Sequence, residues 1–417
     1  MEITKKINMT SMESVKDSLD LKSLKVCVIG IGRIGLPTAL SFANAGLKTI
    51  GVDINQNLID MINNNDFPLK DEVGYEEIFH RVLENKNLSV TSNAKLAVES
   101  SDLILLSLPT PMNKENIPYY DALQSVGKNL SEILQPNSLV IVESTIEPGF
   151  IENELINLIE SSGRLKIKQD FTIGVCPENA NPGQILHDFT NLPRLVGGID
   201  ENTREIIKMI YNFVFSVELI PMPNCKTANA VKLTTNVFRD INIAFISELS
   251  LLFEKLGIDT LTVLEAAKKK YNFQIHYPGS GVGGPCLPIN SYQFLNTAKR
   301  MGMNLDIIDT CRKMNEKMPQ HVIELTLDAF KESNIPIKDS DILILGISYK
   351  PDVKDIQLTP AEEIIKILKD KGAKIHLYDP YFSSTDVFGI HVNSDIEQII
   401  SKVDASIIVT GHSEFKK

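Results

Sequence analysis

The sequence lacks paired cysteines and any long apolar run, and both absences exclude classes of protein. Its five cysteines are odd in number and lie far apart, which predicts neither a disulfide framework nor a zinc site. Unpaired cysteines are typical of a reducing compartment, so we expect a cytoplasmic protein. No stretch reaches the roughly 18 apolar residues of a membrane span, and residues 1–22 contain no apolar signal-peptide core.

Basic residues are the minority, with 42 Lys and Arg against 53 Asp and Glu and a net charge of −11. This charge disfavours binding to nucleic acid or to an anionic membrane, so we expect neither as a partner. The 7 histidines are scattered without metal-ligand spacing, so no metal is expected. A length of 417 residues predicts two to three domains.

A glycine-rich turn near the N-terminus predicts a dinucleotide-binding site. An apolar run at 25–29 leads into Gly30, Gly32 and Gly35, a helical pattern follows, and a second strand ends at Asp53. Gly30 permits a tight turn, Gly32 lets a pyrophosphate approach the backbone, and Gly35 lets the helix pack on the strand. The carboxylate of Asp53 accepts hydrogen bonds from ribose hydroxyls and repels a 2′-phosphate, which favours NAD over NADP.

Three further strands are expected at 102–108, 138–143 and 171–176, and each is followed by a polar side chain. These polar residues are Thr110, Thr145 and Glu178. Ligands of a doubly wound sheet bind at the carboxyl ends of its strands, so we expect the three side chains at one edge. For either threonine alone, turn capping is the alternative interpretation.

A helical pattern runs from 227 to 256 and is apolar nearly all round, which predicts a buried helix, plausibly packed against a second copy of the chain. Lys232, Asn236 and Arg239 are spaced i, i+4 and i+7, so they share one face. Two cations and an amide on a buried helix need partners. Either a bound ligand or internal ion pairs would provide them.

The loop at 278–288 contains four glycines in six residues, flanking prolines and the single thiol of Cys286. Glycine allows the backbone to approach a ligand closely, and proline stiffens the loop. Cys286 is therefore a candidate covalent nucleophile. The alternative is a tight turn that carries a buried, inert cysteine.

The last third predicts another α/β unit, with strands at 341–347, 374–378 and 403–409 and a helix at 360–371. It lacks a glycine fingerprint, so we expect it to bind a nucleotide other than a second NAD. The predicted fold class is α/β, with two Rossmann-like doubly wound domains joined by a long central helix. The predicted segments are a polar and fraying extension at 1–22, an NAD-binding domain at 23–218, a helical dimerisation region with the cysteine loop at 219–320, and a second nucleotide-binding domain, short at its C-terminus, at 321–417.

Taken together, these segments resemble the UDP-glucose/GDP-mannose dehydrogenase family from about residue 24 onward, and most of all its UDP-N-acetylmannosamine 6-dehydrogenase branch. The resemblance is carried by residues 28–37, 52–55, 108–111, 144–149, 232–245 and the loop at 278–288. It implies a homodimeric, NAD-dependent oxidoreductase of polysaccharide biosynthesis. Such an enzyme oxidises the C6 alcohol of a UDP-sugar to a carboxylate, through a thiohemiacetal and a thioester on Cys286.

The resemblance also implies roles for individual side chains. Lys232 assists proton transfer and stabilises oxyanion charge, Asn236 orients the substrate, and Glu178 is a base. Arg239 matches a substrate contact that is supplied across the dimer. The implied cofactor contacts are Gly30, Gly32, Arg33, Ile34, Gly35, Asp53, Thr110, Thr145 and Gln357. The implied substrate contacts are Glu178, Asn179, Lys232, Asn236, Arg239, Gly283, Tyr349 and Lys350.

Four positions depart from the family pattern. Asn290 replaces an aspartate found four residues after the nucleophile in many members, and a neutral amide does not accept the proton of the hydrolytic water. Glu178 or a neutral Lys232 is left for that duty. Gln357 and Asn179 stand in place of arginines, and Asn229 in place of a glutamate. The open alternatives are UDP-N-acetylglucosamine, UDP-glucose or GDP-mannose as substrate, and a non-catalytic protein that binds NAD and a sugar nucleotide.

Overall fold

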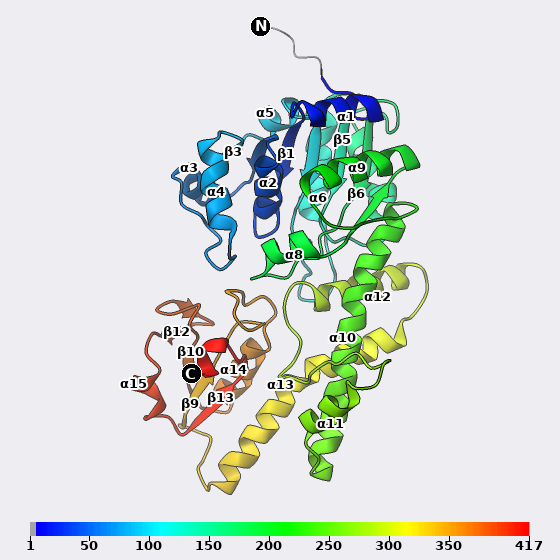
Figure 1. The fold of residues 1–417 in the computed structure, drawn as a ribbon. Helices are drawn as coiled ribbons and strands as arrows, with labels where there is room; N and C mark the ends of the chain where they lie inside the picture. Colours follow the sequence, from blue (N-terminus) through cyan, green and yellow to red (C-terminus); the bar gives the residue numbers. More distant parts are fainter. Residues whose placement is uncertain (1–5, 417) are drawn as a thin grey trace. The chain divides into compact units, whose positions relative to one another are not determined.

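The computed structural model describes residues 6–416 and contains two compact units, which meet at Thr234 and Thr235 within one long helix (Figure 1). Residues 1–5 and residue 417, which belong to the predicted end segments, lie outside the described residues. Each unit is built on its own sheet.

The first unit contains an eight-stranded sheet with the order β3-β2-β1-β4-β5-β6-β7-β8. The strands from β1 to β6 are parallel, and β7 is antiparallel to β6. The strand order reverses between β1 and β4, which is where a doubly wound sheet binds its ligand. The strands are β1 (Lys25–Ile29), β2 (Lys48–Val52), β3 (Leu88–Thr91), β4 (Leu103–Leu106), β5 (Ser138–Val142), β6 (Phe171–Val175), β7 (Arg194–Gly198) and β8 (Leu219–Pro221).

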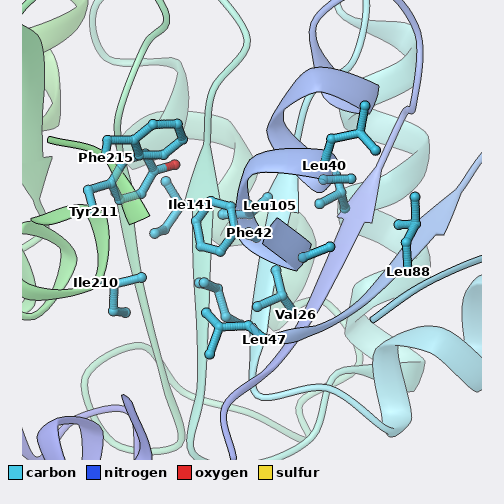
Figure 2. Close-up of a cluster of buried hydrophobic side chains, with 14 of the residues drawn as sticks. Val26, Leu40, Phe42, Leu47, Leu88, Leu105, Ile141, Ile210, Tyr211 and Phe215 are labelled. Carbon is cyan, nitrogen blue, oxygen red and sulfur yellow. The ribbon is translucent and has the colours of Figure 1, made fainter. Parts of the chain in front are cut away.

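Helices cover both faces of this sheet, and two hydrophobic cores result. Alternate residues of a strand point to opposite faces, so Val26 and Val28 of β1 enter one core, whereas Cys27 and Ile29 enter the other. Figure 2 shows the first core, where strand residues meet the helix residues Phe42 and Tyr211. The helices are α1 (Met12–Asp20), α2 (Gly35–Asn44), α3 (Gln56–Asn63), α4 (Tyr75–Glu84), α5 (Ala94–Glu99), α6 (Asp121–Ile133), the π-helical turn η1 (Ile151–Leu155), α7 (Ile156–Glu160), α8 (Ile185–Asn191), α9 (Glu201–Val214) and the first part of α10 (Cys225–Leu256).

The second unit contains the rest of α10 and a five-stranded sheet with the order β11-β12-β10-β9-β13. Its strands are parallel except for β11, which pairs antiparallel with β12. Its other elements are α11 (Thr260–Ala267), α12 (Leu287–Arg300), α13 (Asp306–Glu332), β9 (Asp341–Leu345), α14 (Pro360–Asp370), β10 (Lys374–Tyr378), β11 (Asp386–Val387), β12 (Ile390–Asn393), α15 (Glu397–Ile400), β13 (Ala405–Ile408) and the 3₁₀ turn η2 (Ser413–Lys416).

The predicted α/β class, with two Rossmann-like units and a long helix between them in the chain, is confirmed. The helix α10 begins at Cys225, two residues before the predicted start, and ends at Leu256 as predicted. The strand predicted at 102–108 is shorter, because the backbone leaves the sheet after Leu106. There the N–H of Leu108 donates to the side chain of Ser144 instead of to a neighbouring strand.

The composition of α10 predicts a helix that is buried all round, but within this single chain the helix is not. Four large apolar side chains are about half exposed, from Phe238 at 47% to Leu256 at 61%. Three of them, Phe238, Phe245 and Leu252, are spaced by seven residues, which places them along one face of the helix. Such an exposed apolar face becomes buried only when another protein surface packs against it.

The expectation of a fraying extension at residues 1–22 is wrong for the residues that the structure describes. Ser11 caps α1 by accepting a hydrogen bond from the N–H of Ser14. Met9, Val15 and Leu19 are buried in the first core, and α1 packs against α9. Val15 and Leu19 are spaced i, i+4, so isolated apolar residues in a polar segment form one buried stripe.

This packing predicts that Leu19→Ala destabilises the protein by about 2–4 kcal/mol, because it leaves a cavity in the first core. We expect the first unit's melting temperature to fall by roughly 5–10 °C in calorimetry. The exposed neighbour change Glu13→Ala on the same helix is the control, with no resolved shift. Equal melting curves for both variants would show that α1 does not stabilise the fold.

Candidate active site

Three glycines shape the loop between β1 and α2, each for its own steric reason. Gly30 has φ +87°, and a Cβ there would lie 2.4 Å from the carbonyl oxygen of Ser107. A Cβ on Gly35 would lie 1.7 Å from the carbonyl oxygen of Gly30, so the helix could not pack on the turn. A Cβ on Gly32 would meet no atom within 4 Å, so its backbone faces open space. This arrangement fits a pyrophosphate beside Gly32.

The start of α2 and the end of β2 complete the fit to a dinucleotide. Among the described residues no side chain caps α2, so its first N–H groups point to the same space. The Oδ2 atom of Asp53 accepts from the N–H of Ile31 at 3.0 Å, and Oδ1 accepts from the N–H of Asn55 at 2.9 Å. These bonds fix the carboxylate against the glycine loop while leaving it capacity to accept from ribose hydroxyls.

Arg33 and Ile34, the other two residues expected from this loop, are held by the protein. Ile34 packs against the first core. The guanidinium of Arg33 lies between two carboxylates, at 2.5 Å from Oδ2 of Asp71 and 2.7 Å from Oε1 of Glu72. Partial burial alone would lower the pKa of Arg33, but the hydrogen bonds and charges of Asp71 and Glu72 raise it. Glu72 is a residue that the sequence pattern did not single out.

The predicted gathering of polar groups at the carboxyl ends of the strands is present in the first unit. After β4 and β5, the hydroxyl of Thr110 donates to the carbonyl oxygen of Thr145 at 2.9 Å. Ser144 also ties the two loops, because its hydroxyl accepts from the N–H of Leu108 and donates to the carbonyl oxygen of Leu108, both at 2.8 Å. The Thr110 bond joins two loops 35 residues apart, so local turn capping does not explain it.

After β6, the chain presents Glu178 to a cation of α10. The Nζ atom of Lys232 lies 3.8 Å from Oε1 of Glu178 and 3.5 Å from Oδ1 of Asn179. Lys232 is only 6% exposed, so its charge is matched by a neighbouring carboxylate. The other oxygen of Glu178 accepts from the N–H of Ala180, and the amide of Asn179 donates to the carbonyl of Pro193.

The predicted polar face of α10 divides into two parts. Lys232 and Asn236 are buried, whereas Arg239 is exposed and has no ion pair within residues 6–416. Internal ion pairing, one of the two interpretations from the sequence, therefore applies to Lys232. It does not apply to Arg239, which remains available to a ligand or a partner chain.

In the second unit, the cysteine loop lies against the loop that follows β9. The N–H of Gly284 donates to the carbonyl oxygen of Gln357 at 2.8 Å. A Cβ on Gly283 would lie 2.4 Å from the carbonyl oxygen of Leu358, and one on Gly284 would lie 2.5 Å from the ring of Tyr349. Glycine is required at both positions, because any side chain would push the two loops apart.

Cys286 is the residue just before α12, and it is half-buried. The start of a helix favours negative charge, as on a reacting sulfur. The interpretation as a buried, inert thiol describes other cysteines of this chain instead: burial raises the pKa of Cys27 and Cys176 to about 12. Cys286 thus differs from both in exposure and in position.

A buried polar network holds the cysteine loop in place. Most of its residues were not predicted from the sequence. Arg312 donates to the carbonyl oxygen of Val282 at 3.3 Å and to Oδ1 of Asp240 at 2.6 Å. Asp240 also accepts from the hydroxyl of Ser291 at 2.7 Å. All these side chains except that of Val282 are buried, so they fix the loop to α10, α12 and α13. Asp240 follows Arg239 directly in the sequence, but its ion-pair partner is Arg312, 72 residues away.

Asn236 and Asn290 belong to the same region. The amide of Asn236 donates to Oδ1 of Asn290 at 2.6 Å, and the amide of Asn290 donates to Oε1 of Gln293 at 3.1 Å. Asn290 is therefore a buried link in an amide chain. Its Oδ1 atom already accepts the hydrogen bond from Asn236.

The end of β10 shows why the second sheet suits another ligand. Asp379 occupies the place that Asp53 has in the first sheet, after the strand beside the central one. Its Oδ2 atom accepts from the N–H of Ile347 at 2.8 Å and from Nε2 of His412 at 3.0 Å. Burial alone would raise the pKa of Asp379, but the hydrogen bonds from His412, Ile347 and Tyr381 lower it. This carboxylate is fully buried.

The predicted site residues thus fall into two sets, one in each unit. Tyr349, Lys350 and Gln357 lie in the loop between β9 and α14. The first unit holds Gly30, Gly32, Arg33, Ile34, Gly35, Asp53, Thr110, Thr145, Glu178, Asn179 and Lys232, and the second holds Asn236, Arg239, Gly283, Cys286, Tyr349, Lys350 and Gln357.

The first sheet and its glycine loop define a dinucleotide-binding protein, and comparison with known proteins narrows the class. Residues 24–214, 226–317 and 343–417 match the NAD binding, central and UDP binding domains of the UDP-glucose/GDP-mannose dehydrogenase family. The chain belongs to this family. It is an NAD-dependent nucleotide-sugar dehydrogenase.

Individual relatives cover nearly the whole chain. A UDP-N-acetyl-D-mannosamine dehydrogenase from Pyrococcus horikoshii is 31% identical, over 94% of this chain and 90% of that protein. A UDP-N-acetyl-D-glucosamine 6-dehydrogenase from Salmonella typhi is 30% identical, over 95% of this chain and 92% of that protein. A solved structure of the UDP-D-ManNAc dehydrogenase from Pyrococcus horikoshii matches with a TM-score of 0.88 and 30% identity, over 94% of this chain and 91% of that one.

Two general properties of the described residues complete the description. Among residues 6–416, none of the helices combines the length and apolar character needed to cross a membrane. Over the same range, no group of three or more His, Cys, Asp and Glu side chains is placed to bind a metal ion.

The glycine loop makes a prediction that separates binding from folding. Gly32→Ala meets no protein atom, so we expect an unchanged melting temperature. The added methyl group occupies the space assigned to the pyrophosphate, so the Kd for NAD should rise about tenfold or more in a fluorescence titration.

The contrasting variant is Gly35→Ala, whose Cβ collides with the backbone of Gly30. It should lower stability as well as binding. If Gly32→Ala binds NAD like the wild type, the pyrophosphate does not lie beside Gly32.

Proposed function

We propose that this chain oxidises the C6 alcohol of a UDP-N-acetylhexosamine, with UDP-N-acetylmannosamine as its preferred substrate, to the uronate. The observation that carries the proposal is the half-buried Cys286 at the start of α12, in a loop fixed from behind by Arg312. Both relatives described above are named for UDP-N-acetylated sugars, one a mannosamine and the other a glucosamine. The alternatives are UDP-N-acetylglucosamine, UDP-glucose and GDP-mannose.

The thiol explains how one site carries out a four-electron oxidation. The first oxidation converts the C6 alcohol to an aldehyde. The sulfur of Cys286 then adds to C6, a C–S bond forms, and the aldehyde oxygen takes a proton to give a thiohemiacetal. Loss of a hydride from C6 and of the proton from its hydroxyl group leaves a thioester. Water adds to its carbonyl, the C–S bond breaks, and the products are the carboxylate, two protons and the free thiolate.

Three side chains assist these steps in our proposal. The ammonium of Lys232 stabilises the negative charge that develops on the C6 oxygen, because it is buried and therefore weakly screened. Asn236 orients the substrate. Glu178 takes the proton of the hydrolytic water, since the neutral amide of Asn290 cannot do so. The 3.8 Å approach of Lys232 to Glu178 lets the cation balance that carboxylate.

The cofactor would be held by the glycine loop, by Asp53 and by the tied loops of Thr110 and Thr145, with Arg33, Ile34 and Gln357 as further proposed contacts. Bound NAD⁺ would supply the hydride acceptor for both oxidation steps. The covered carboxylate of Asp379 supports a different role for the second sheet, which we assign to UDP. Tyr349, Lys350 and Gly283 would contact the sugar nucleotide there, and Asn179 would contact it from the first unit.

Acidic residues outnumber basic ones and give the chain a net charge of −11, so the pyrophosphate of a UDP-sugar needs cations placed specifically beside it. Lys350 and Arg239 are our candidates. Arg239 is exposed in the single chain and lies on the helix whose exposed apolar face we assign to a second copy. The proposed enzyme is therefore a cytoplasmic homodimer in which Arg239 completes a site of the partner subunit.

Substrate identity is tested by incubating the purified protein with NAD and each of UDP-N-acetylmannosamine, UDP-N-acetylglucosamine, UDP-glucose and GDP-mannose. We expect the highest kcat/KM for UDP-N-acetylmannosamine, read as NADH absorbance. A higher value for another sugar reassigns the substrate. No NADH with any sugar would favour a non-catalytic binding protein.

The role of Glu178 predicts the fate of a variant. In Glu178→Gln, hydrolysis slows about 100-fold or more because the base is lost, and the thioester on Cys286 accumulates. Intact-mass spectrometry after acid quench should detect this adduct. The exposed change Glu201→Gln on α9 is the matched control and should show none. Normal turnover in Glu178→Gln refutes the assignment.

The homodimer predicts that a charge on the exposed face of α10 separates the subunits. Phe245→Glu places a carboxylate on that face, so the protein should elute as a monomer in light-scattering chromatography. The control Leu96→Glu changes a more exposed apolar residue, on α5 in the first unit. A dimer that survives in Phe245→Glu locates the interface elsewhere.

A further inference from the structure

Glu72 lies at a junction that the proposed mechanism does not use. Its side chain is 2% exposed, although it follows Asp71 in a loop between α3 and α4. A buried carboxylate must be paired or hydrogen-bonded to be tolerated. Glu72 meets that requirement with partners from two different functional loops.

One partner is Arg33 of the glycine loop. Its Nη1 atom lies 2.7 Å from Oε1 of Glu72. The neighbouring Asp71 holds the other end of the same guanidinium at 2.5 Å. The cofactor loop is thus attached to residues 71–72 by charge-assisted hydrogen bonds, which are stronger than neutral ones.

The other partners are backbone groups just before and at the start of α8. Oε1 of Glu72 also accepts from the N–H of Gly183 at 2.7 Å, and Oε2 accepts from the N–H of Ile185 at 3.1 Å. Gly74 packs on the same helix, since a Cβ there would lie 2.6 Å from the side chain of Leu186. Gly74 has φ +86°, a backbone conformation that favours glycine.

The segment anchored in this way is the one that presents Glu178 and Asn179. It leaves β6, where the N–H of Cys176 donates to the carbonyl of Val142, and it reaches α8 at Ile185. Asp188 of α8 accepts from the backbone N–H and the side-chain amide of Asn181. Glu72 therefore fixes the far end of a segment whose near end is fixed by the sheet.

We propose that Glu72 is a positioning residue that couples the cofactor loop, through Arg33, to the segment that carries Glu178. One carboxylate is shared by the two loops, so whatever restrains Arg33 also restrains residues 177–185. Binding of NAD beside the glycine loop then orders the proposed catalytic base before the sugar nucleotide is engaged. The inference rests on the proposed role of Glu178.

The test compares Glu72→Gln with Asp71→Asn. Each hydrogen bond that Glu72 accepts is donated by an N–H group. In the glutamine variant the side-chain NH₂ group, itself a donor, would face one of these N–H groups, and that hydrogen bond would be lost. Asp71→Asn disturbs the same guanidinium but leaves the bonds to Gly183 and Ile185 intact. Hydrogen exchange of the peptide at 177–185, followed by mass spectrometry with and without NAD, reads the coupling without turnover.

In the wild type we expect NAD to slow exchange in 177–185 about fivefold or more. Asp71→Asn should keep this effect, and Glu72→Gln should lose it and lower kcat about tenfold. Equal behaviour of the two variants, or a wild-type peptide that ignores NAD, overturns the proposal. If Glu72→Gln does not fold, the wild-type measurement still tests the coupling, because a peptide that ignores NAD contradicts it. Because it needs no sugar, it is independent of whether the proposed substrate is turned over.

Discussion

The site depends on one constraint, the convergence of loops at the carboxyl edge of a parallel sheet. Parallel strands end at the same edge, so residues far apart in sequence meet there without a special contact to bring them together. In the first unit this edge gathers the glycine loop, Asp53, Thr110, Thr145 and Glu178. In the second, the loop after β9 meets the cysteine loop through the bond from Gly284 to Gln357. The remaining contacts refine positions that the two sheets already set.

The two sheets use the same carboxylate position in opposite ways. Asp53 is oriented by two backbone N–H groups and keeps acceptor capacity for a ligand. The carboxylate of Asp379 instead accepts its hydrogen bonds from backbone N–H groups and from the buried imidazole of His412. One chain thus builds two similar sheets, but the carboxylate at this position is partly exposed in the first and fully buried in the second, which agrees with an NAD binding domain and a UDP binding domain in one family.

Much of this could be predicted from the sequence because its signals are local. The glycine fingerprint, the apolar strands and the long helix depend on residues that are near each other, and their predicted positions hold to within a few residues. The buried pairs could not be predicted. Glu72 meets Gly183, and Asp240 meets Arg312, across separations that only the folded chain closes. The helix α1 was missed because its apolar stripe consists of few residues among many polar ones.

The chemistry of Cys286 gives the chain its proposed identity as a four-electron dehydrogenase. Its position before α12, the glycines that let its loop approach Tyr349, and the buried side chains of Asp240 and Arg312 all help to position this half-buried thiol. The most direct measurement is the yield of NADH from a limiting amount of UDP-N-acetylmannosamine with excess NAD. The account predicts two NADH for each sugar consumed, together with the uronate. One NADH for each sugar and release of an aldehyde would contradict it.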